Sequence, residues 1–459
     1  MREPRFSLMR VFLPLLGILS PLFPLYAYFR GNFYNVLEPF SLAMIFGITA
    51  YIYFLNVLII STRKKFLDRY FGHDRVMQFH GYMATAAFVF AVIHRQLKIA
   101  VFPVVNLQTR LGNAAFIIFL TLIAVTVIIM VPGLIHRFAP FAKLRNFITR
   151  KLGLDYSILK FFHNFLVLAV LLLSFHVFLA SSTQESWGRI ILMALWSLTA
   201  LVFWLDHKLF RPFRLKRMNS RVENINLLEG DIRELYIRPP QNFTFTPGQF
   251  VFVGFPGSKA GNDEHPYTIS SAPGDSILRI SAKNLGNFSN SLRFLQENDP
   301  ALIDGPYGRF YPPRDRDEEL IFIAGGIGIT PLLSILRDMA ESKPSREQKI
   351  VLFWAVRSPE DLCYREEIVE AGKKINSMNP GMFHFVPVVQ TRGSQIPEAE
   401  EGFLTQEIIR NHCEARDMKI PHARVYFCGP PAMRRYLFPK LHQLGIQRKH
   451  IHFEMFSLG

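Results

Sequence analysis

The chain has 459 residues, half of them hydrophobic, and a formal net charge of +16 at pH 7. This length leaves room for two or three domains. Its three cysteines, Cys363, Cys413 and Cys428, show neither zinc-ligand nor iron–sulfur spacing, and no CxxCH sequence is present. A disulfide-stabilised secreted domain and a cysteine-bound metal centre are therefore excluded.

The positive charge is concentrated in one half of the chain. Residues 1–217 contain 24 Lys and Arg against 7 Asp and Glu, whereas residues 218–459 contain 28 against 29. The apolar runs lie in the same basic half, which argues against binding of nucleic acid by a basic soluble domain. The composition predicts a membrane half followed by a soluble half.

Six stretches of the first half approach the roughly 20 apolar residues that a helix needs to cross a bilayer. The first contains three prolines and should be kinked, and a cleaved signal peptide is the alternative interpretation for it. The predicted spans are 11–29, 40–60, 76–94, 114–135, 158–180 and 190–205.

The connections between these stretches differ in charge. One side holds 19 Lys and Arg, and the other holds five. Because basic loops stay in the cytoplasm, we expect the N-terminus and the whole soluble half to face the cytoplasm.

Two of the predicted spans each carry a pair of histidines. His80 and His94 lie fourteen residues apart in the third span, and His163 and His176 lie thirteen apart in the fifth. At 1.5 Å per residue the members of each pair are about 20 Å apart along the helix. The pattern predicts two stacked b haems, an inner one on His80 and His163 and an outer one on His94 and His176.

The spacing of His163 and His176 in the fifth span does not place both histidines on one face of an ideal helix. Fourteen residues return to nearly the same helix face, whereas thirteen fall about 140° away. The fifth span is therefore expected to contain a π-bulge or a kink, or else to approach the haem differently. The alternative is that the histidines are ordinary core residues and bind no haem.

The second half begins as short alternating runs from about Phe213, which predict an antiparallel barrel. The sequence HPYTISS, residues 265–271, offers an aromatic ring between hydroxyls at a strand end. The glycine turn of KNLGNFS, residues 283–289, precedes a helix and could hold a pyrophosphate. Residues 304–308, DGPYG, are expected to form a tight turn that closes the barrel.

The last third alternates strands and helices, as a doubly wound α/β domain requires. An apolar run at 319–324 leads into GGIGITP, residues 325–331, and a helix is expected from Leu332. Strand, glycine turn and helix form a dinucleotide cradle, although the sequence lacks GxGxxG. In such sheets ligands bind at the edge where the strands end. The residues that the later strands place at this edge are Arg357, Thr391, Arg392 and Cys428 to Pro430.

Taken together, these motifs resemble the ferric reductase and NADPH oxidase superfamily over nearly the whole chain. The order HPYTISS, KNLGNFS, DGPYG, AGGIGITP and CGPP is specific as a set. The resemblance implies a six-helix transmembrane haem bundle at 1–210, an antiparallel β-barrel FAD domain at 213–316 and an α/β NAD(P)H domain at 317–459. It also implies an integral protein of a bacterial-type inner or plasma membrane.

The resemblance assigns roles to individual residues. Thr268, Cys428 and Phe456 would take part in the chemistry, with Cys428 near the nicotinamide and Phe456 over the flavin, although three residues follow Phe456. Guanidinium groups suit the 2′-phosphate of NADPH, so Arg357 and Arg392 favour NADPH over NADH. The remaining contacts would be His265, Pro266, Tyr267 and Thr268 to FAD, Lys283, Gly286 and Ser289 to its phosphates, and Gly325, Gly326, Gly328, Thr330, Thr391, Cys428, Gly429 and Pro430 to the dinucleotide.

The predicted function is electron transfer from cytoplasmic NAD(P)H, through FAD and two b haems, to an extracytoplasmic acceptor. That acceptor would be a ferric chelate or dioxygen, which would give superoxide. Lys98 lies one turn beyond His94, but the outer half of the second span has Glu38 and no arginine, which favours the chelate. The alternative is a membrane-anchored flavin reductase without haem.

Overall fold

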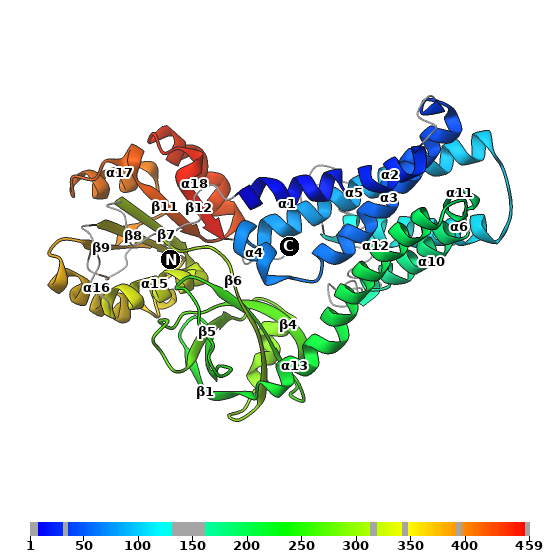
Figure 1. Cartoon of the computed structure of the whole chain (residues 1–459). Helices are drawn as coiled ribbons and strands as arrows, with labels where there is room; N and C mark the ends of the chain where they lie inside the picture. The colour runs from blue at the N-terminus through cyan, green and yellow to red at the C-terminus, as the bar shows by residue number, and fades with distance from the viewer. Residues whose placement is uncertain are drawn as a thin grey trace. The chain divides into compact units, whose positions relative to one another are not determined.

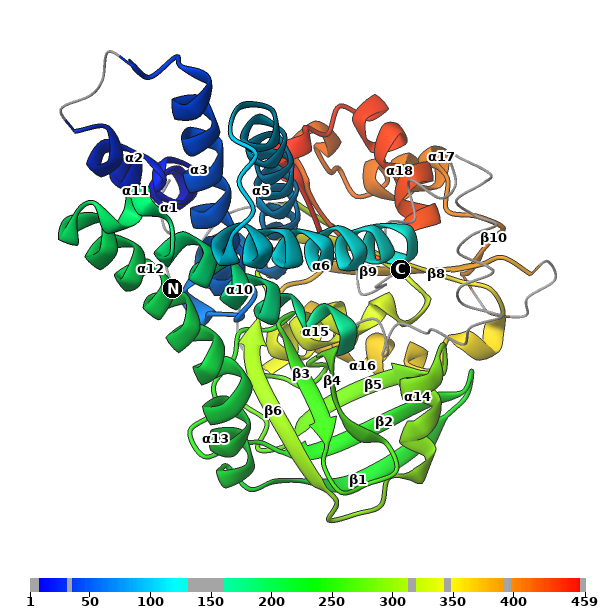
Figure 2. The same cartoon turned by 90° about the vertical axis from the view of Figure 1, so that its right-hand side faces the viewer.

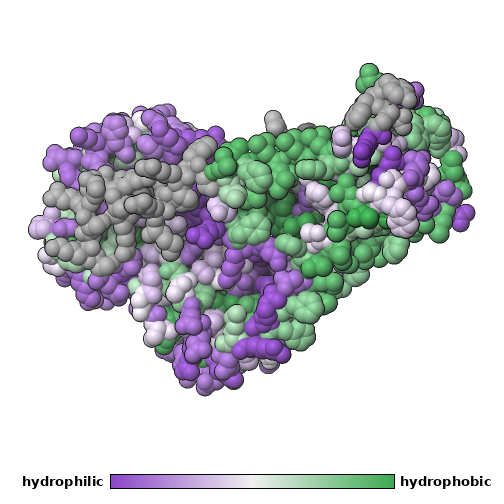
Figure 3. Space-filling view, in the orientation of Figure 1, coloured by the Kyte–Doolittle hydropathy of each residue, from purple (hydrophilic) through white to green (hydrophobic). Residues whose placement is uncertain are grey.

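The computed structural model describes residues 8–30, 35–130, 161–312, 319–341, 348–391, 396 and 398–454. The chain divides into two compact units between Phe210 and Arg211. The first is helical and the second combines sheets and helices (Figure 1). Hydrophobic residues cover much of the helical unit on the face shown in Figure 3.

Six helices in the described part of the chain are long and apolar enough to cross a membrane. They confirm a long apolar helix at each of the six predicted spans, although the third and sixth are longer than expected and residues 131–135 and 158–160 of the predicted spans lie outside the described residues. Polar residues continue a helix past the apolar core because its hydrogen bonds lie within the backbone. The six segments are Leu8–Phe29, Pro39–Ile60, His73–Val101, Leu107–Thr126, Phe161–Phe178 and Trp187–Arg217.

The first segment is interrupted, as its prolines predicted. Helix α1 (Leu8–Leu19) ends before a turn at Ser20 and Pro21, and α2 (Leu22–Phe29) follows. Proline has no amide hydrogen to donate within a helix. The kink therefore falls at the second of the three prolines.

The fifth segment also contains the expected irregularity. Helix α10 (Leu166–Phe178) carries His176, whereas His163 lies in helical residues 161–163, which a turn at 164–165 separates from α10. Between them the amides of Phe165 and Leu168 bond the carbonyls three residues earlier, at 2.9 Å in both cases. A tighter turn changes the rotation between the two histidines from that of an ideal helix.

Helix α3 (Pro39–Ile60) is the most buried of the six segments. The Tyr51 hydroxyl donates to Ser174 Oγ at 3.0 Å and lies 2.5 Å from Ser197 Oγ on α12 (Trp187–Leu205). Nearby, Trp196 Nε1 donates to Asn56 Oδ1 at 3.1 Å. Polar groups inside an apolar bundle need partners from the protein, so these contacts connect α3 to α10 and α12.

The second unit begins with an antiparallel barrel. The described strands pair in the order β4-β3-β6-β1-β2-β5, and a bridge between Ile269 and Ile280 joins the two ends of the sheet (Figure 2). The strands are β1 (Ser220–Leu228), β2 (Ile232–Arg238), β3 (Phe250–Phe255), β4 (Gly261–Thr268), β5 (Leu278–Lys283) and β6 (Pro300–Tyr307).

One predicted element of this barrel was wrong. Residues 304–307 form the end of β6, where Asp304 pairs with Phe252 and Tyr307 with Phe250 across a register irregularity. A Cβ on Gly305 would lie 2.7 Å from Val251 Cγ1, so glycine permits this close approach. The glycine therefore reflects a β-bulge rather than a tight turn.

The rest of the second unit is a parallel sheet with the order β10-β9-β8-β7-β11-β12. Chain order reverses between β7 and β11, which makes this the topological switch point. The strands are β7 (Glu319–Gly325), β8 (Lys349–Val356), β9 (Phe383–Val389), β10 (Glu400–Glu401), β11 (Arg424–Cys428) and β12 (Ile451–Glu454).

Both faces of this sheet are covered, as the doubly wound prediction requires. Leu320 and Phe322 belong to one core with α15 (Thr330–Glu341) and α16 (Arg365–Met378). Ile321 and Ile323 belong to the other core with α17 (Gln406–Glu414) and α18 (Pro431–Gln443). Burial on both faces explains why β7 is a continuous apolar run.

A buried network of charged and hydroxyl groups joins the barrel to this α/β domain. Glu234 of β2, 2% exposed, pairs with Arg279 and accepts from Tyr364 at 3.1 Å. Arg279 Nη2 lies 3.0 Å from Glu367 Oε2 on α16, and Arg337 of α15 also pairs with Glu367. These contacts hold the barrel and the α/β domain in one orientation.

Replacement of Glu234 by alanine should leave the buried guanidinium of Arg279 with one carboxylate partner instead of two. We expect a loss of about 3–5 kcal/mol in unfolding free energy, the usual cost of removing one side of a buried pair. Urea unfolding of the purified chain in detergent measures it. Glu229→Ala, an exposed site in the same domain, should change stability by less than about 0.5 kcal/mol. Equal urea midpoints for the two variants would contradict the role of the network.

Candidate cofactor-binding sites

The two segments predicted to bind the dinucleotide meet at the switch point. Ala324 of β7 pairs with Cys428 of β11, so the glycine turn and the CGPP segment leave the sheet side by side. A Cβ on Gly325 would lie 2.6 Å from Pro430 Cδ, and one on Gly328 would lie 2.2 Å from the Cys428 carbonyl oxygen. Glycine is therefore required for the two backbones to approach, and Cys428 itself is 2% exposed.

The turn between β7 and α15 is held by its own hydrogen bonds. Gly326 has a φ of +54°, which favours glycine, and its carbonyl accepts from Trp354 Nε1 at 2.8 Å. The Thr330 hydroxyl donates to the Ile327 carbonyl at 3.1 Å and is buried. Residues 326–329 form a 3-10 turn and α15 begins at Thr330, two residues before the predicted start.

The basic residues predicted to select NADPH follow the neighbouring strands. Arg357 comes directly after β8 and is exposed. Thr391 follows β9, and its hydroxyl donates to the Arg357 carbonyl at 2.7 Å, so the two loop segments lie together. Arg392 lies outside the described residues, as does Phe456.

In the barrel, β4 carries His265, Pro266, Tyr267 and Thr268. The His265 ring stacks on Phe288 with centroids 3.7 Å apart, and Tyr267 lies at 6.4 Å from the same ring. Burial raises the pKa of Tyr267, so its phenol stays neutral. The HPYT and NLGNFS sequences thus lie together, and the contacts of His265, Pro266, Tyr267 and Thr268 with FAD stay predictions.

Two of the residues predicted to contact phosphate have protein partners in this structure. Ser289 Oγ accepts from the amides of Leu285 at 2.9 Å and Gly286 at 3.0 Å, at the start of α14 (Asn287–Ser291). The Lys283 ammonium pairs with Asp361 of the α/β domain at 2.6 Å. The contacts of Lys283, Gly286 and Ser289 with FAD phosphate stay predictions.

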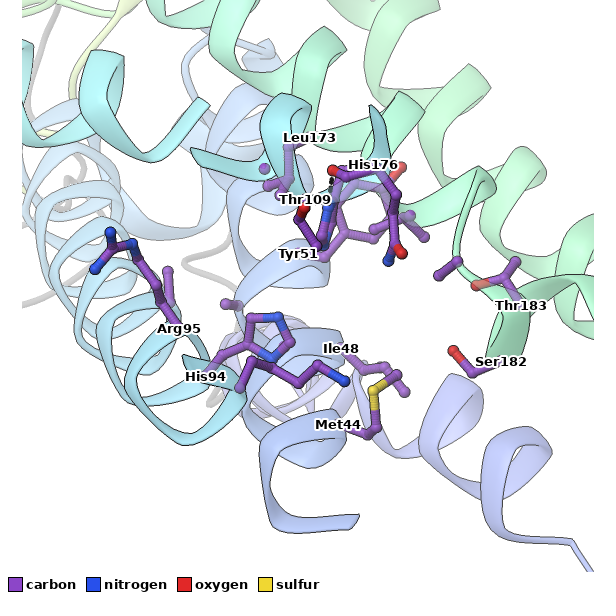
Figure 4. Close-up of a pocket in the computed structure, with 18 of the residues that line it drawn as sticks. Met44, Ile48, Tyr51, His94, Arg95, Thr109, Leu173, His176, Ser182 and Thr183 are labelled. Carbon is purple, nitrogen blue, oxygen red and sulfur yellow. Dashed lines mark hydrogen bonds between the residues drawn. The ribbon is translucent and has the colours of Figure 1, made fainter. Parts of the chain in front are cut away.

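The outer pair of histidines lines a cavity of about 440 Å³ within the helical unit. His94 comes from α5 (His73–Val101) and His176 from α10, and both reach the same cavity (Figure 4). Their ring centroids are 6.3 Å apart and their planes differ by 81°. Arg95, Lys98 and Arg189 line the cavity, and no carboxylate is among its described lining residues.

This spacing fits a metal ion between the two rings. Two metal–nitrogen bonds of about 2.0–2.1 Å, plus about 1.1 Å from each nitrogen to its ring centre, give about 6.3 Å. Nδ1 of His94 bonds the Ala43 carbonyl at 2.7 Å, and Nδ1 of His176 bonds the Gln108 carbonyl at 2.8 Å. A carbonyl only accepts, so each Nε2 keeps its lone pair for a metal.

The inner pair of histidines also lies inside the helical unit. His80 lies near His163, and the Nδ1 atoms of both are buried. Neither Nδ1 forms a hydrogen bond with a described residue. Binding of haem by either pair of histidines stays a prediction, and the described residues contain no cluster of three or more His, Cys, Asp or Glu that could hold a metal ion.

Several residues of these sites were missed from the sequence. Phe288 lies inside the NLGNFS motif, so its aromatic ring was a usable signal. Trp354 sits in an apolar strand, and Gly47 and Gly112 sit in apolar spans, where nothing in the local pattern distinguishes them.

Replacement of Gly328 by alanine should separate the turn after β7 from β11, because the new Cβ would meet a backbone oxygen. We expect at least a tenfold loss of affinity for NADPH while FAD binding persists, since the barrel is untouched. Titration calorimetry with NADP⁺, which cannot reduce the flavin, and flavin absorbance measure the two. Gly274→Ala, whose Cβ would meet only Glu341 at 3.6 Å, is the control, and matching affinities in both variants would contradict the expectation.

Two family models match the second unit. Residues 217–310 match the FAD-binding domain family, and residues 322–437 match the oxidoreductase NAD-binding domain family. A solved reductase, cytochrome P450 reductase GcoB of Amycolatopsis, is 24% identical with a TM-score of 0.44, over 52% of this chain and 70% of that one.

Curated relatives extend the comparison. The chain is 29% identical to the reductase component of propane 2-monooxygenase of Rhodococcus jostii, over 53% of this chain and 64% of the relative. It thus spans less than two thirds of that relative. It is 27% identical to sulfhydrogenase 2 subunit gamma of Pyrococcus furiosus, over 53% of this chain and 82% of the relative.

The similarity to dual oxidase 2 reaches into the helical unit. Dual oxidase 2 of Rattus norvegicus is 23% identical over 440 residues, which cover 85% of this chain and 27% of the relative. The chain therefore combines six helices that are long and apolar enough to span a membrane with one segment that matches an FAD-binding domain family and one that matches an oxidoreductase NAD-binding domain family.

Proposed function

We propose that the chain is a membrane flavocytochrome that moves electrons from cytoplasmic NAD(P)H, through FAD and two b haems, to an acceptor on the other side of the membrane. The observation that carries this proposal is the pair His94 and His176. Their rings stand 6.3 Å apart across a cavity inside an apolar bundle, with each Nδ1 held by a backbone carbonyl. An imidazole placed so in a membrane is expensive unless it serves a function.

The residues of the helical unit would hold the two haems in sequence. His80 and His163 would hold the inner haem, and His94 and His176 the outer one. Arg95 and Lys98 lie one and four residues after His94 and line its cavity, so they could neutralise propionates. Bound FAD would take two electrons from NAD(P)H and release them one at a time. Each bound haem would carry one electron, and no substrate would bind at its iron.

The residues of the second unit would bind and orient the donor. The glycine turn at 325–330 and the segment Cys428 to Pro430 flank the switch point, where dinucleotides bind in such sheets. The exposed Arg357 beside Thr391 favours NADPH, because a guanidinium binds phosphate with two donors. The network of Glu234, Arg279 and Glu367 would keep flavin and nicotinamide sites in register.

Two acceptors have support. Glu38, in place of an arginine near the outer end of α3, favours a ferric chelate. The similarity to dual oxidase 2 over 85% of the chain favours dioxygen, which would be reduced to superoxide. The predicted excess of Lys and Arg on one side of the membrane favours a cytoplasmic position for the NAD(P)H-binding half. Electrons would then flow outward to either acceptor.

Stopped-flow spectroscopy under nitrogen tests the electron path. We expect NADPH to bleach FAD and then to give reduced b-type haem bands in the purified protein, more rapidly than NADH. His80→Ala should keep FAD bleaching but lose the haem bands, because the inner haem lies between FAD and the outer one. Gln78→Ala, an exposed neighbour on α5, should behave as the unmodified chain.

A pyridine haemochrome assay distinguishes the proposed flavocytochrome from the main alternative, a flavin reductase without haem. Two haems b per FAD are expected, whereas bleaching of FAD with no haem b in the protein would instead establish a membrane-anchored flavin reductase.

Reduction of cytochrome c, with and without superoxide dismutase, identifies the acceptor. A ferric chelate reductase should reduce ferric citrate in the absence of oxygen and give a cytochrome c signal that dismutase does not change. An oxidase should instead lose most of that signal when dismutase is present. Membrane vesicles of known orientation, supplied with NADPH on one face only, test the direction: reduction of an impermeant acceptor on the same face would contradict outward flow.

A further inference from the structure

The outer histidines occupy two copies of the same local arrangement. His94 of α5 bonds the Ala43 carbonyl of α3, and the residue four positions after Ala43 is Gly47. His176 of α10 bonds a carbonyl of α6 (Leu107–Met130), and the residue four positions after that carbonyl is again a glycine. The second pair is Gln108 and Gly112. Two different pairs of helices therefore present an imidazole to a helix backbone in the same way.

The position of the glycines explains how a ring reaches a helix carbonyl at all. A helical side chain points toward the N-terminus and covers the turn that precedes it. A residue at 47 or 112 would therefore cover the carbonyl at 43 or 108. Glycine has no side chain, so the carbonyl stays open to an incoming donor.

The fit around these glycines is tight. A Cβ at position 47 would lie 2.5 Å from His94 Nδ1, and one at position 112 would lie 2.6 Å from His176 Nδ1. Non-bonded atoms prefer about 3.5–4.0 Å, so each ring would have to move by about 1 Å. Such a shift would break hydrogen bonds that are now 2.7 and 2.8 Å long.

The glycines also oppose local helix preference. Glycine in a helix interior is less favourable than alanine. Gly81, one residue after His80 on α5, shows that not every glycine of the bundle has this contact, because a Cβ there would meet nothing within 4 Å. The two glycines beside the outer histidines are therefore distinguished by what they touch.

We propose that Gly47 and Gly112 are positioning residues for the outer haem, an inference that rests on the proposed function. They open the carbonyls of Ala43 and Gln108 to the imidazoles of His94 and His176. The hydrogen bonds then set the tautomer, with the proton on Nδ1 and the lone pair on Nε2. They also hold the two ring planes 81° apart, each plane being set by its own pair of helices.

This arrangement has a spectroscopic consequence. Nearly perpendicular axial imidazoles give a low-spin ferric haem with a strongly anisotropic electron paramagnetic resonance signal. A donor hydrogen bond from Nδ1 to a carbonyl raises the basicity of the ligating nitrogen. More basic ligands stabilise the ferric state, so loss of the bond should raise the reduction potential of the outer haem.

The experiment compares Gly47→Ala and Gly112→Ala with Gly81→Ala in the full-length purified protein. Changes in hydrogen-bonding partners of metal ligands typically weaken binding by 10–100-fold. We expect each test variant to lose the outer haem, or to keep it with a shifted anisotropic signal and a raised potential. Gly81→Ala should retain two haems with unchanged spectra and potentials.

A second variant covers the case in which neither test variant folds. His94→Gly would leave space for a free ligand, and imidazole has an N–H for the Ala43 carbonyl whereas 1-methylimidazole does not. We expect imidazole to restore the outer haem spectrum at a concentration at least tenfold lower than 1-methylimidazole.

Each outcome has a defined meaning. Equal potency of imidazole and 1-methylimidazole, or two glycine variants that match Gly81→Ala in haem content, spectra and potentials, would overturn the inference while the proposed function stands. Absence of haem from the unmodified protein would overturn both. Haem loss in the test variants with equal loss in Gly81→Ala would show that any extra methyl group disturbs the bundle, and would also reject the specific role of Gly47 and Gly112.

Discussion

The helical unit depends on one constraint: a polar group inside an apolar bundle must find its partner within the protein. The side chains of α3 and its neighbours satisfy it in several ways, with Tyr51 between two serines and Asn56 beside Trp196. The same constraint acts on His94 and His176. Because carbonyls of neighbouring helices bond their Nδ1 atoms, each Nε2 keeps a lone pair that could bind a metal.

Both units contain glycines whose backbone lies very close to another group. At the switch point of the parallel sheet, Gly328 lies against the Cys428 carbonyl, which brings the two dinucleotide segments together. In the bundle, Gly47 and Gly112 lie against imidazole rings. In each case the missing side chain leaves room for another group at a site where cofactors would bind, and an added methyl group would have to displace backbone or a buried ring.

The two domains of the second unit are joined by charge rather than by a broad apolar surface alone. Glu234, Arg279, Arg337 and Glu367 form a chain of buried and half-buried pairs between the barrel and the α/β domain. Lys283 with Asp361 adds a further pair. Buried ion pairs are weak evidence for stability but restrict orientation, which suits a site where one cofactor must face another. The pairing of Lys283 also shows how a residue expected at a phosphate can serve the interface between domains.

The sequence by itself determined the six spans, the kink at the prolines, the barrel followed by a doubly wound domain and the positions of the motifs. These features follow from local periodicity and from the chemistry of proline and glycine. Only the tertiary structure decided that residues 304–307 end a strand, that Phe288 stacks on His265, and that Gly47 and Gly112 face the outer histidines. Such contacts join residues far apart in the chain, and they depend on the rotation and packing of whole elements, which no local pattern records.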